Sequence, residues 1–185
     1  LGFSSFSGLL TAVVFLPLGG AFVIALFLKE SRTIRIFVAT LAIVELSLSA
    51  IVFVLYYLDA KRMHDIGETA GITLIDRLDS WIPNLNISYY LGVDGLSAPL
   101  VLLSGLLGMA AIFVSWHIEH RVREYFVWLL VLWTSVMGVF TSLDFVLFFI
   151  FWELELVPMY FLIAIWGSGR KEYSAMKFLI FTLLG

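Results

Sequence analysis

The sequence contains no cysteine and few charged residues for its length. With none of its 185 residues a cysteine, the chain can form no disulfide and can hold no thiolate-bound iron–sulfur cluster. Charged residues make up 14% of the chain and hydrophobic residues 62%, whereas soluble domains are about 45–50% apolar. This balance predicts a protein whose solvent is the lipid bilayer.

Motifs for phosphate binding and nucleophilic catalysis are also missing. The sequence has no glycine-rich phosphate loop and no nucleophile elbow. Its three histidines, His64, His117 and His120, fall in or beside expected loops. Glu119 stands between the last two, but no complete ligand set accompanies the pair. We therefore predict surface histidines rather than a metal site, no cofactor within this chain, and any redox chemistry elsewhere.

Five long apolar runs have the roughly 20 residues that a membrane-spanning helix needs. A sixth run starts near Tyr173 and is still apolar at Gly185. Because half a spanning helix would leave carbonyls unsatisfied in hydrocarbon, we expect the sequence to be part of a longer chain. The fold class predicted is all-α, a polytopic integral membrane protein with five complete spans and the start of a sixth. The five runs are residues 6–28, 34–58, 91–116, 125–143 and 145–166.

The expected organisation has four parts. Residues 1–58 hold the first two spans, 59–90 form an extracytoplasmic loop, 91–143 hold the third and fourth spans, and 144–185 hold the fifth span and the truncated sixth. Basic residues favour one set of alternate loops, which the positive-inside rule places in the cytoplasm, with the N-terminus outside. That set is Lys29, Arg32, Arg35, Arg121, Arg123, Arg170 and Lys171, against Lys61, Arg62 and Arg77 on the other side.

The 59–90 loop shows two local patterns. Apolar residues recur at helical spacing between residues 74 and 82, which predicts a short amphipathic helix on the membrane surface that Pro83 ends. Residues 84–90 alternate apolar and polar side chains, which predicts an extended strand or hairpin. We favour a structural cap over helix ends for this loop rather than a ligand site. The apolar set is Leu74, Ile75, Leu78, Trp81 and Ile82.

Two acids interrupt the apolar, aromatic run FFIFWELELVPMYF at residues 148–161. A carboxylate within a spanning segment is by default a functional-site hypothesis. Glu153 falls near the middle of its span, and Glu155 points about 200° away from it around the helix. Pro158 deprives the Leu154 carbonyl of its usual donor and loosens the helix beside Glu153. We predict that Glu153 handles protons and that Glu155 is a secondary candidate; the alternative is a protonated acid that only joins helices.

Three further charged residues need an interpretation. Glu45 lies well inside the second span and is a weak proton-path candidate, with Ser47 and Ser49 as neighbours that could pack against it. Lys177 near the start of the sixth run fits either a lysine that reaches the membrane surface or a proton-path charge. Asp94, in the phrase LGVDGLSAPL, is predicted to cap the third helix.

Three segments resemble a known family. They are WIPNLNISYYLGVDGLSAPLVLLSGLLG at 81–108, LFFIFWELELVPMYFLIAIWG at 147–167 and YSAMKFLIFTLLG at 173–185. Together they are similar to the antiporter-like chain M of proton-translocating NADH:quinone oxidoreductase (respiratory complex I), whose mitochondrial counterpart is subunit 4. The resemblance covers most of this chain but only the N-terminal portion of such subunits.

The resemblance implies proton translocation, driven by quinone reduction, through a chain without a cofactor of its own. NADH, FMN, iron–sulfur clusters and quinone are expected in other subunits of the complex. The family's essential glutamate matches Glu153, and its usual partner is a lysine on a seventh helix beyond Gly185. Lys177 matches a conserved K-F motif, Glu155 is an acid in only some relatives, and Glu45 matches no motif.

The resemblance also implies partners and a location. The partners are other membrane-arm subunits, among them the antiporter-like chains L and N. The location is an energy-converting membrane, for which we favour the bacterial inner membrane. Relatives of the same helices in multisubunit Na⁺/H⁺ antiporters and membrane-bound hydrogenases leave those functions as alternatives. A membrane scaffold is a further alternative.

Overall fold

Helices dominate the computed structural model, which describes residues 8–65, 71–82 and 87–184. Five of them are long and apolar enough to cross a membrane, which confirms the predicted fold class. The shorter α6 follows as the start of a sixth. The helices are α1 (Leu9–Phe27), α2 (Ser31–Asp65), α3 (Ser97–Val114), α4 (Val122–Thr141), α5 (Phe145–Trp166) and α6 (Lys171–Leu184), with a 3₁₀ turn, η2 (Ser115–His117), after α3.

Most helix bounds lie close to the predicted ones, with two exceptions. Helix α5 has the predicted limits and continues without a break through Pro158. Helix α2 runs to Asp65, so the first part of the expected 59–90 loop is helical. The third span does not begin at residue 91, because strand β2 (Ile87–Val93) occupies residues 91–93 and α3 starts only at Ser97.

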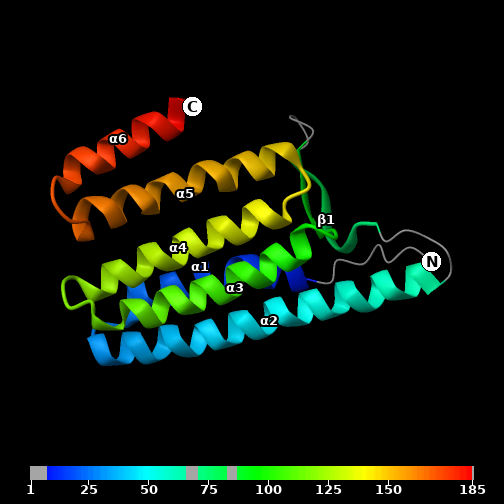
Figure 1. The fold of residues 1–185 in the computed structure, drawn as a ribbon, viewed down its shortest axis with the longest axis horizontal. Helices are drawn as coiled ribbons and strands as arrows, with labels where there is room; N and C mark the ends of the chain where they lie inside the picture. Colours follow the sequence, from blue (N-terminus) through cyan, green and yellow to red (C-terminus); the bar gives the residue numbers. More distant parts are fainter. Residues whose placement is uncertain (1–7, 66–70, 83–86, 185) are drawn as a thin grey trace.

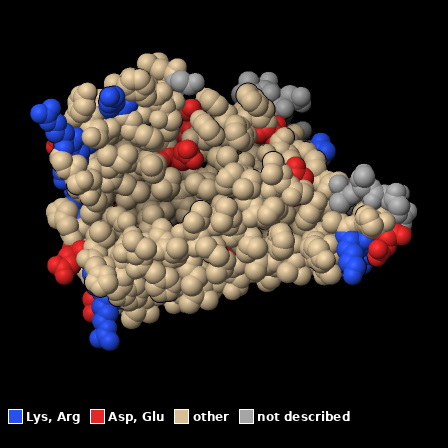
Figure 2. All heavy atoms as spheres, viewed as in Figure 1, with Lys and Arg blue, Asp and Glu red and all other residues tan. Residues whose placement is uncertain are grey.

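Successive helices run antiparallel, so that alternate loops gather at the same end of the molecule (Figure 1). The connections α1–α2, α3–α4 and α5–α6 lie at one end, and the long end of α2, the strands and the α4–α5 connection lie at the other. Figure 2 shows Lys and Arg side chains at both ends and a nearly uncharged belt between them. This distribution is that of a protein whose middle faces lipid.

Basic side chains at the α1–α2, α3–α4 and α5–α6 end also bind backbone carbonyls in or just after the last turn of a helix. Arg35 Nη2 donates to the Ile118 carbonyl at 2.8 Å, and Lys171 Nζ donates to the Ile165 carbonyl at 2.7 Å. Arg123 donates to the carbonyl of Ala25 near the end of α1. A cation near a helix C-terminus is favourable because the free carbonyls carry partial negative charge. These three residues lie near the starts of α2, α4 and α6 and so stabilise the neighbouring connections.

The segment expected to form an amphipathic helix is instead a β-strand, and that prediction was wrong. Strand β1 (Thr73–Ile82) pairs antiparallel with β2, placing Asp76 opposite Leu91 and Leu78 opposite Tyr89. Short apolar runs fit a helix or a strand equally well by spacing alone, and the pairing with β2 decides for the strand. The predicted extended segment is confirmed from residue 87 onward, and residues 83–86, with Pro83, lie outside the described part.

This β-hairpin does cap helix ends, as predicted for the loop. The Asp76 side chain accepts hydrogen bonds from the backbone N–H of Gly8 and of Thr11, both at 2.9 Å, and from the Thr11 hydroxyl at 3.0 Å. The hydroxyl of Tyr89 donates to Thr11 Oγ1 at 3.0 Å. On the other side, the Leu143 N–H donates to the Tyr90 carbonyl at 2.9 Å. The hairpin therefore joins the start of α1 to the α4–α5 connection.

Replacing Asp76 with alanine should destabilise the protein by about 1–3 kcal/mol, because half-buried N–H donors at the start of α1 would lose their acceptor. Asp76 is itself fully buried, so water cannot easily replace it. The measurement is thermal unfolding in detergent. Asp65→Ala, which removes an exposed acid at the end of α2, is the matched control, and an equal loss in both variants would contradict a capping role.

Candidate functional site

Glu153 lies deep within α5. The Asp144 carboxylate caps this helix by accepting from the backbone N–H of Val146 and Leu147 at 2.9 and 3.1 Å. Glu153 follows Phe145 by eight residues and precedes Trp166 by thirteen, which places it about 12 Å from one helix end and about 20 Å from the other at 1.5 Å per residue. Its carboxyl group therefore lies inside the apolar belt.

Both α5 acids are half-buried in this chain. Figure 2 shows acidic atoms within the otherwise uncharged belt over α5, whose acids are Glu153 and Glu155. Among the described residues, neither carboxylate makes an ion pair or a side-chain hydrogen bond. Half-exposed acids at this depth need water or groups from outside these residues to solvate them.

Close packing against α4 fixes the position of α5. Gly138 of α4 faces the buried ring of Phe151, which fills the space that a side chain at 138 would need. One end of the contact is held by Trp128 and Phe161, whose rings stack with centroids 4.4 Å apart. Glu153 stands two residues after Phe151, so this packing sets its rotation and its depth.

Lys177 does not pair with either α5 acid in the described structure. Its side chain is exposed, and Nζ lies 5.7 Å from the ring centroid of Phe181, within reach of a cation–π attraction. Six residues of α6 carry Lys177 about 9 Å from the start of its helix, whereas Glu155 lies about 16 Å from the corresponding end of α5. The lysine and the acids thus occupy different depths.

Glu45 is the most enclosed of the acids within the helices. It is fully buried, and neither carboxylate oxygen has a hydrogen-bond partner among the described residues. Neither expected neighbour hydrogen-bonds to Glu45: the Ser47 hydroxyl donates to the Ile43 carbonyl at 2.7 Å, and the Ser49 hydroxyl has no partner among the described residues. Glu45 lies about 21 Å from the start of α2, close to the depth of Glu153.

Asp94 has the structural role that its sequence context predicts. Its Oδ1 accepts from the N–H of Ser97 at 2.8 Å and of Leu96 at 3.0 Å, while Ser97 Oγ accepts from the Asp94 N–H at 2.8 Å. The hydrogen bond from the Ser97 N–H is the main reason that the pKa of this carboxyl lies below its usual value. Asp94 therefore fixes the start of α3.

All three histidines lie at helix ends or in a loop. No group of three or more His, Cys, Asp or Glu side chains that could hold a metal occurs within residues 8–65, 71–82 and 87–184. His120 instead contributes its backbone carbonyl, which accepts from the Trp166 indole N–H at 2.7 Å and ties the end of α5 to the α3–α4 connection.

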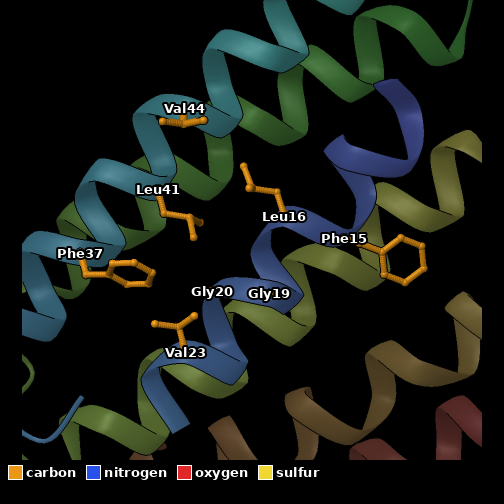
Figure 3. A pocket seen from close by; sticks show the side chains of 8 residues that line it. All are labelled: Phe15, Leu16, Gly19, Gly20, Val23, Phe37, Leu41 and Val44. Atoms are coloured by element: carbon orange, nitrogen blue, oxygen red, sulfur yellow. The ribbon is translucent and has the colours of Figure 1, made fainter. Parts of the chain in front are cut away.

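An apolar groove of about 500 Å³ lies between α1 and α2 (Figure 3). Glycines of α1 open it, and aliphatic and aromatic side chains of both helices form its walls. No lining side chain is polar, so the groove suits hydrocarbon and offers no path for ions. Its lining residues are Phe15, Leu16, Gly19, Gly20, Val23, Phe37, Leu41 and Val44.

The sequence did not reveal the importance of some residues, because segments far away along the chain form their surroundings. Asp76 is buried only because the hairpin folds onto α1, and the nearly buried ring of Trp133 in α4 fills the space beside Gly108 of α3. Glu45 was visible as an acid at depth, but nothing in the local sequence indicates that it faces the protein while the α5 acids are half-exposed.

Comparison with a family model gives a match at residues 142–185 to a family described as "NADH:quinone oxidoreductase/Mrp antiporter, TM". The matched segment contains α5 and α6. It therefore includes Glu153, Glu155 and Lys177.

Curated relatives align with nearly the whole chain. The "NAD(P)H-quinone oxidoreductase chain 4 2" of Thermosynechococcus vestitus is 38% identical over 177 residues, which are 95% of this chain and 32% of the relative. The chain 4-2 protein of Synechocystis sp. is 40% identical over 174 residues, covering 94% and 30%. The chain thus spans about a third of the length of these relatives.

Solved structures share the fold. A chain of respiratory complex I from Thermus thermophilus superposes with a TM-score of 0.77 at 20% identity, covering 95% of this chain and 33% of that one. A chain of the archaeal membrane-bound sulfane sulfur reductase gives 0.76 at 18% identity, covering 94% and 34%. The helix arrangement therefore recurs in respiratory membrane complexes.

Proposed function

We infer from its membership of the NADH:quinone oxidoreductase/Mrp antiporter transmembrane family that this chain is part of a proton-translocating, antiporter-like subunit. We propose that the subunit belongs to a complex I-type NAD(P)H:quinone oxidoreductase and that Glu153 carries the transported proton. The observation that supports this most directly is a carboxyl group placed deep in a spanning helix, within the segment that the family model matches.

The chemistry of the chain fits transport rather than electron transfer. It contains no cysteine, and the resemblance assigns NADH, FMN, iron–sulfur clusters and quinone to other subunits. Electron transfer in those subunits would supply the energy. We also propose neighbouring antiporter-like chains, of the L and N type, as partners and the bacterial inner membrane as the location, with the N-terminus outside.

A mobile positive charge gives Glu153 a way to load and release a proton. At an effective dielectric constant of about 20, moving a unit charge from ~8 to ~4 Å strengthens its attraction to a carboxylate from about 2 to about 4 kcal/mol. That difference is enough to favour proton release when the charge approaches and proton uptake when it withdraws. The charge would come from a lysine outside residues 1–185, because Lys177 is exposed and lies at a different depth from Glu153.

Ion transport by the assembled complex tests the proposal. The native complex containing the full-length chain is placed in liposomes, NADH and a quinone are added, and the pH inside the vesicles is followed. We expect proton movement that an uncoupler abolishes and that does not depend on sodium. Sodium-dependent exchange without quinone reduction would instead favour the Na⁺/H⁺ antiporter function, and no ion movement would favour a scaffold.

A further inference from the structure

Three side chains in the interior formed by α1 to α4 are buried with polar atoms that have no partner among the described residues. They are Glu45, Ser49 and Trp133. Each is almost or fully buried, with exposures of 0%, 0% and 5%. The two Glu45 carboxylate oxygens, Ser49 Oγ and Trp133 Nε1 all lack a hydrogen-bond partner among the described residues. Buried polar groups are nearly always paired, by protein or by ordered water, so four such atoms require an explanation.

Contacts with two glycines of α3 place the three side chains at neighbouring levels of that helix. A side chain at Gly105 would meet Ser49, whose Oγ lies 2.9 Å from that position, and one at Gly108 would overlap the Trp133 ring. Since α2 and α3 run antiparallel (Figure 1), Glu45, one turn before Ser49, lies near the level of Gly108. Glu45 and Trp133 are thus at about the same depth.

Glu45 also points toward the centre of these four helices. Leu41, one turn before it, meets the α1 position of Gly20, and Ser49, one turn after it, meets α3. Residues four apart share a helix face, so the Glu45 side chain enters between α1 and α3, on the side where α2 contacts α4.

No charged residue faces Glu45 from the helices around it. Neither α1 nor α3 contains an ionisable residue, and the ionisable residues of α4, Arg123, Glu124 and Tyr125, lie in its first turn. An isolated carboxylate is very costly to bury. Glu45 therefore needs a proton, water, or both.

The chemistry of the unpartnered atoms is complementary. The indole N–H is a donor only, a serine hydroxyl can donate, and a carboxyl group accepts through both oxygens. Because no direct hydrogen bond joins them, one or more bridging waters would satisfy all four atoms, as buried waters commonly do with about three partners each.

We propose that Glu45, Ser49 and Trp133 form a hydrated proton-binding site inside the α1–α4 bundle. In the loaded state the Glu45 carboxyl O–H donates to a bridging water. On release the proton leaves as a hydrated proton, and the carboxylate accepts hydrogen bonds from water, which is held in turn by the Ser49 hydroxyl and the Trp133 N–H.

A further buried polar group lies next to the site on α4. Thr134, next to Trp133, is fully buried and its hydroxyl also lacks a partner among the described residues. It stands one turn before Gly138, which faces α5, so adjacent residues of α4 present unpaired polar groups on its two sides. The claim that a transported proton passes through this site rests on the proposed function. The claim that the site binds water and a proton does not.

Infrared spectroscopy of the full-length chain in its complex and in lipid tests the site. The carbonyl band of a protonated carboxylic acid is followed while the pH is varied in H₂O and in D₂O. Glu45→Gln should remove one such band, which should survive in Glu153→Gln. Ser49→Ala and Trp133→Phe keep the acid and should shift both the band and the pH at which it is half lost, so the test holds even where Glu45→Gln does not assemble.

Each outcome decides one claim. The hydrated site would be overturned if the Glu45 band did not shift in D₂O, or if neither Ser49→Ala nor Trp133→Phe changed it. Glu45 would then be an acid that packs between helices without water. A band lost in Glu45→Gln with undiminished proton pumping would overturn its role as a station. If the native complex pumps no protons, the proposed function fails, and the infrared result still decides whether the site exists.

Discussion

Proton pumping should fall to the background level of uncoupled vesicles when Glu153 is replaced by glutamine. Glutamine keeps nearly the size and shape of the side chain but cannot release a proton, so the packing of α5 against α4 is retained while the proposed carrier is lost. Quinone reduction and internal acidification, measured together in liposomes containing the complex, report the number of protons moved per electron pair.

Glu155→Gln is the matched control for this experiment. It removes an acid from the same helix, two residues away and also half-buried, but it leaves the proposed carrier in place. We expect a smaller loss of pumping than in Glu153→Gln. If Glu153→Gln pumps at the native ratio, Glu153 is not the carrier; if both variants lose pumping equally, the two acids act together.

Gly138→Ala should destabilise the contact between α4 and α5 by about 1–3 kcal/mol, the usual cost of overfilling a packed interior. The added methyl group would overlap the ring of Phe151, which is only 4% exposed and cannot turn away freely. The measurement is thermal unfolding in detergent, together with proton pumping, since a displaced α5 would also move Glu153.

Two further variants separate overlap from other effects of the substitution. Phe151→Leu in the Gly138→Ala background makes room for the methyl group and should restore part of the stability. Gly19→Ala adds the same atoms in α1 where nothing lies within 4 Å, and it should be neutral or stabilising because alanine favours helix by up to about 1 kcal/mol over glycine. Equal losses at both glycines would contradict the packing explanation.

The spanning helices were largely predictable because a helix in lipid needs an apolar sequence of a certain length. An apolar run of sufficient length specifies a helix almost without reference to the rest of the chain. Helix α5 keeps the limits of its apolar run because Asp144 caps its start and Gly167 follows its last residue. The end of α2 was not, because its last two turns are polar and extend past the apolar run.

Features that depend on contacts between segments far apart in the sequence could not be predicted from the local sequence. The spacing of Leu74, Ile75 and Leu78 fits a helix, and only the pairing with β2 shows that the segment is a strand. The same limit applies to the acids. Glu153 was selected by depth and by resemblance, whereas the full enclosure of Glu45 depends on contacts of α2 with α1 and α3.

The hydrogen bonds of the hairpin set an order in which parts of this protein can pack during synthesis. Asp76 bonds to residues 68 and 65 positions earlier, so the start of α1 lacks these acceptors until α2 and strand β1 have been synthesised. The bond from Leu143 to Tyr90 comes later still, after α3 and α4. The hairpin can therefore pack over the start of α1 before it can pack over the start of α5.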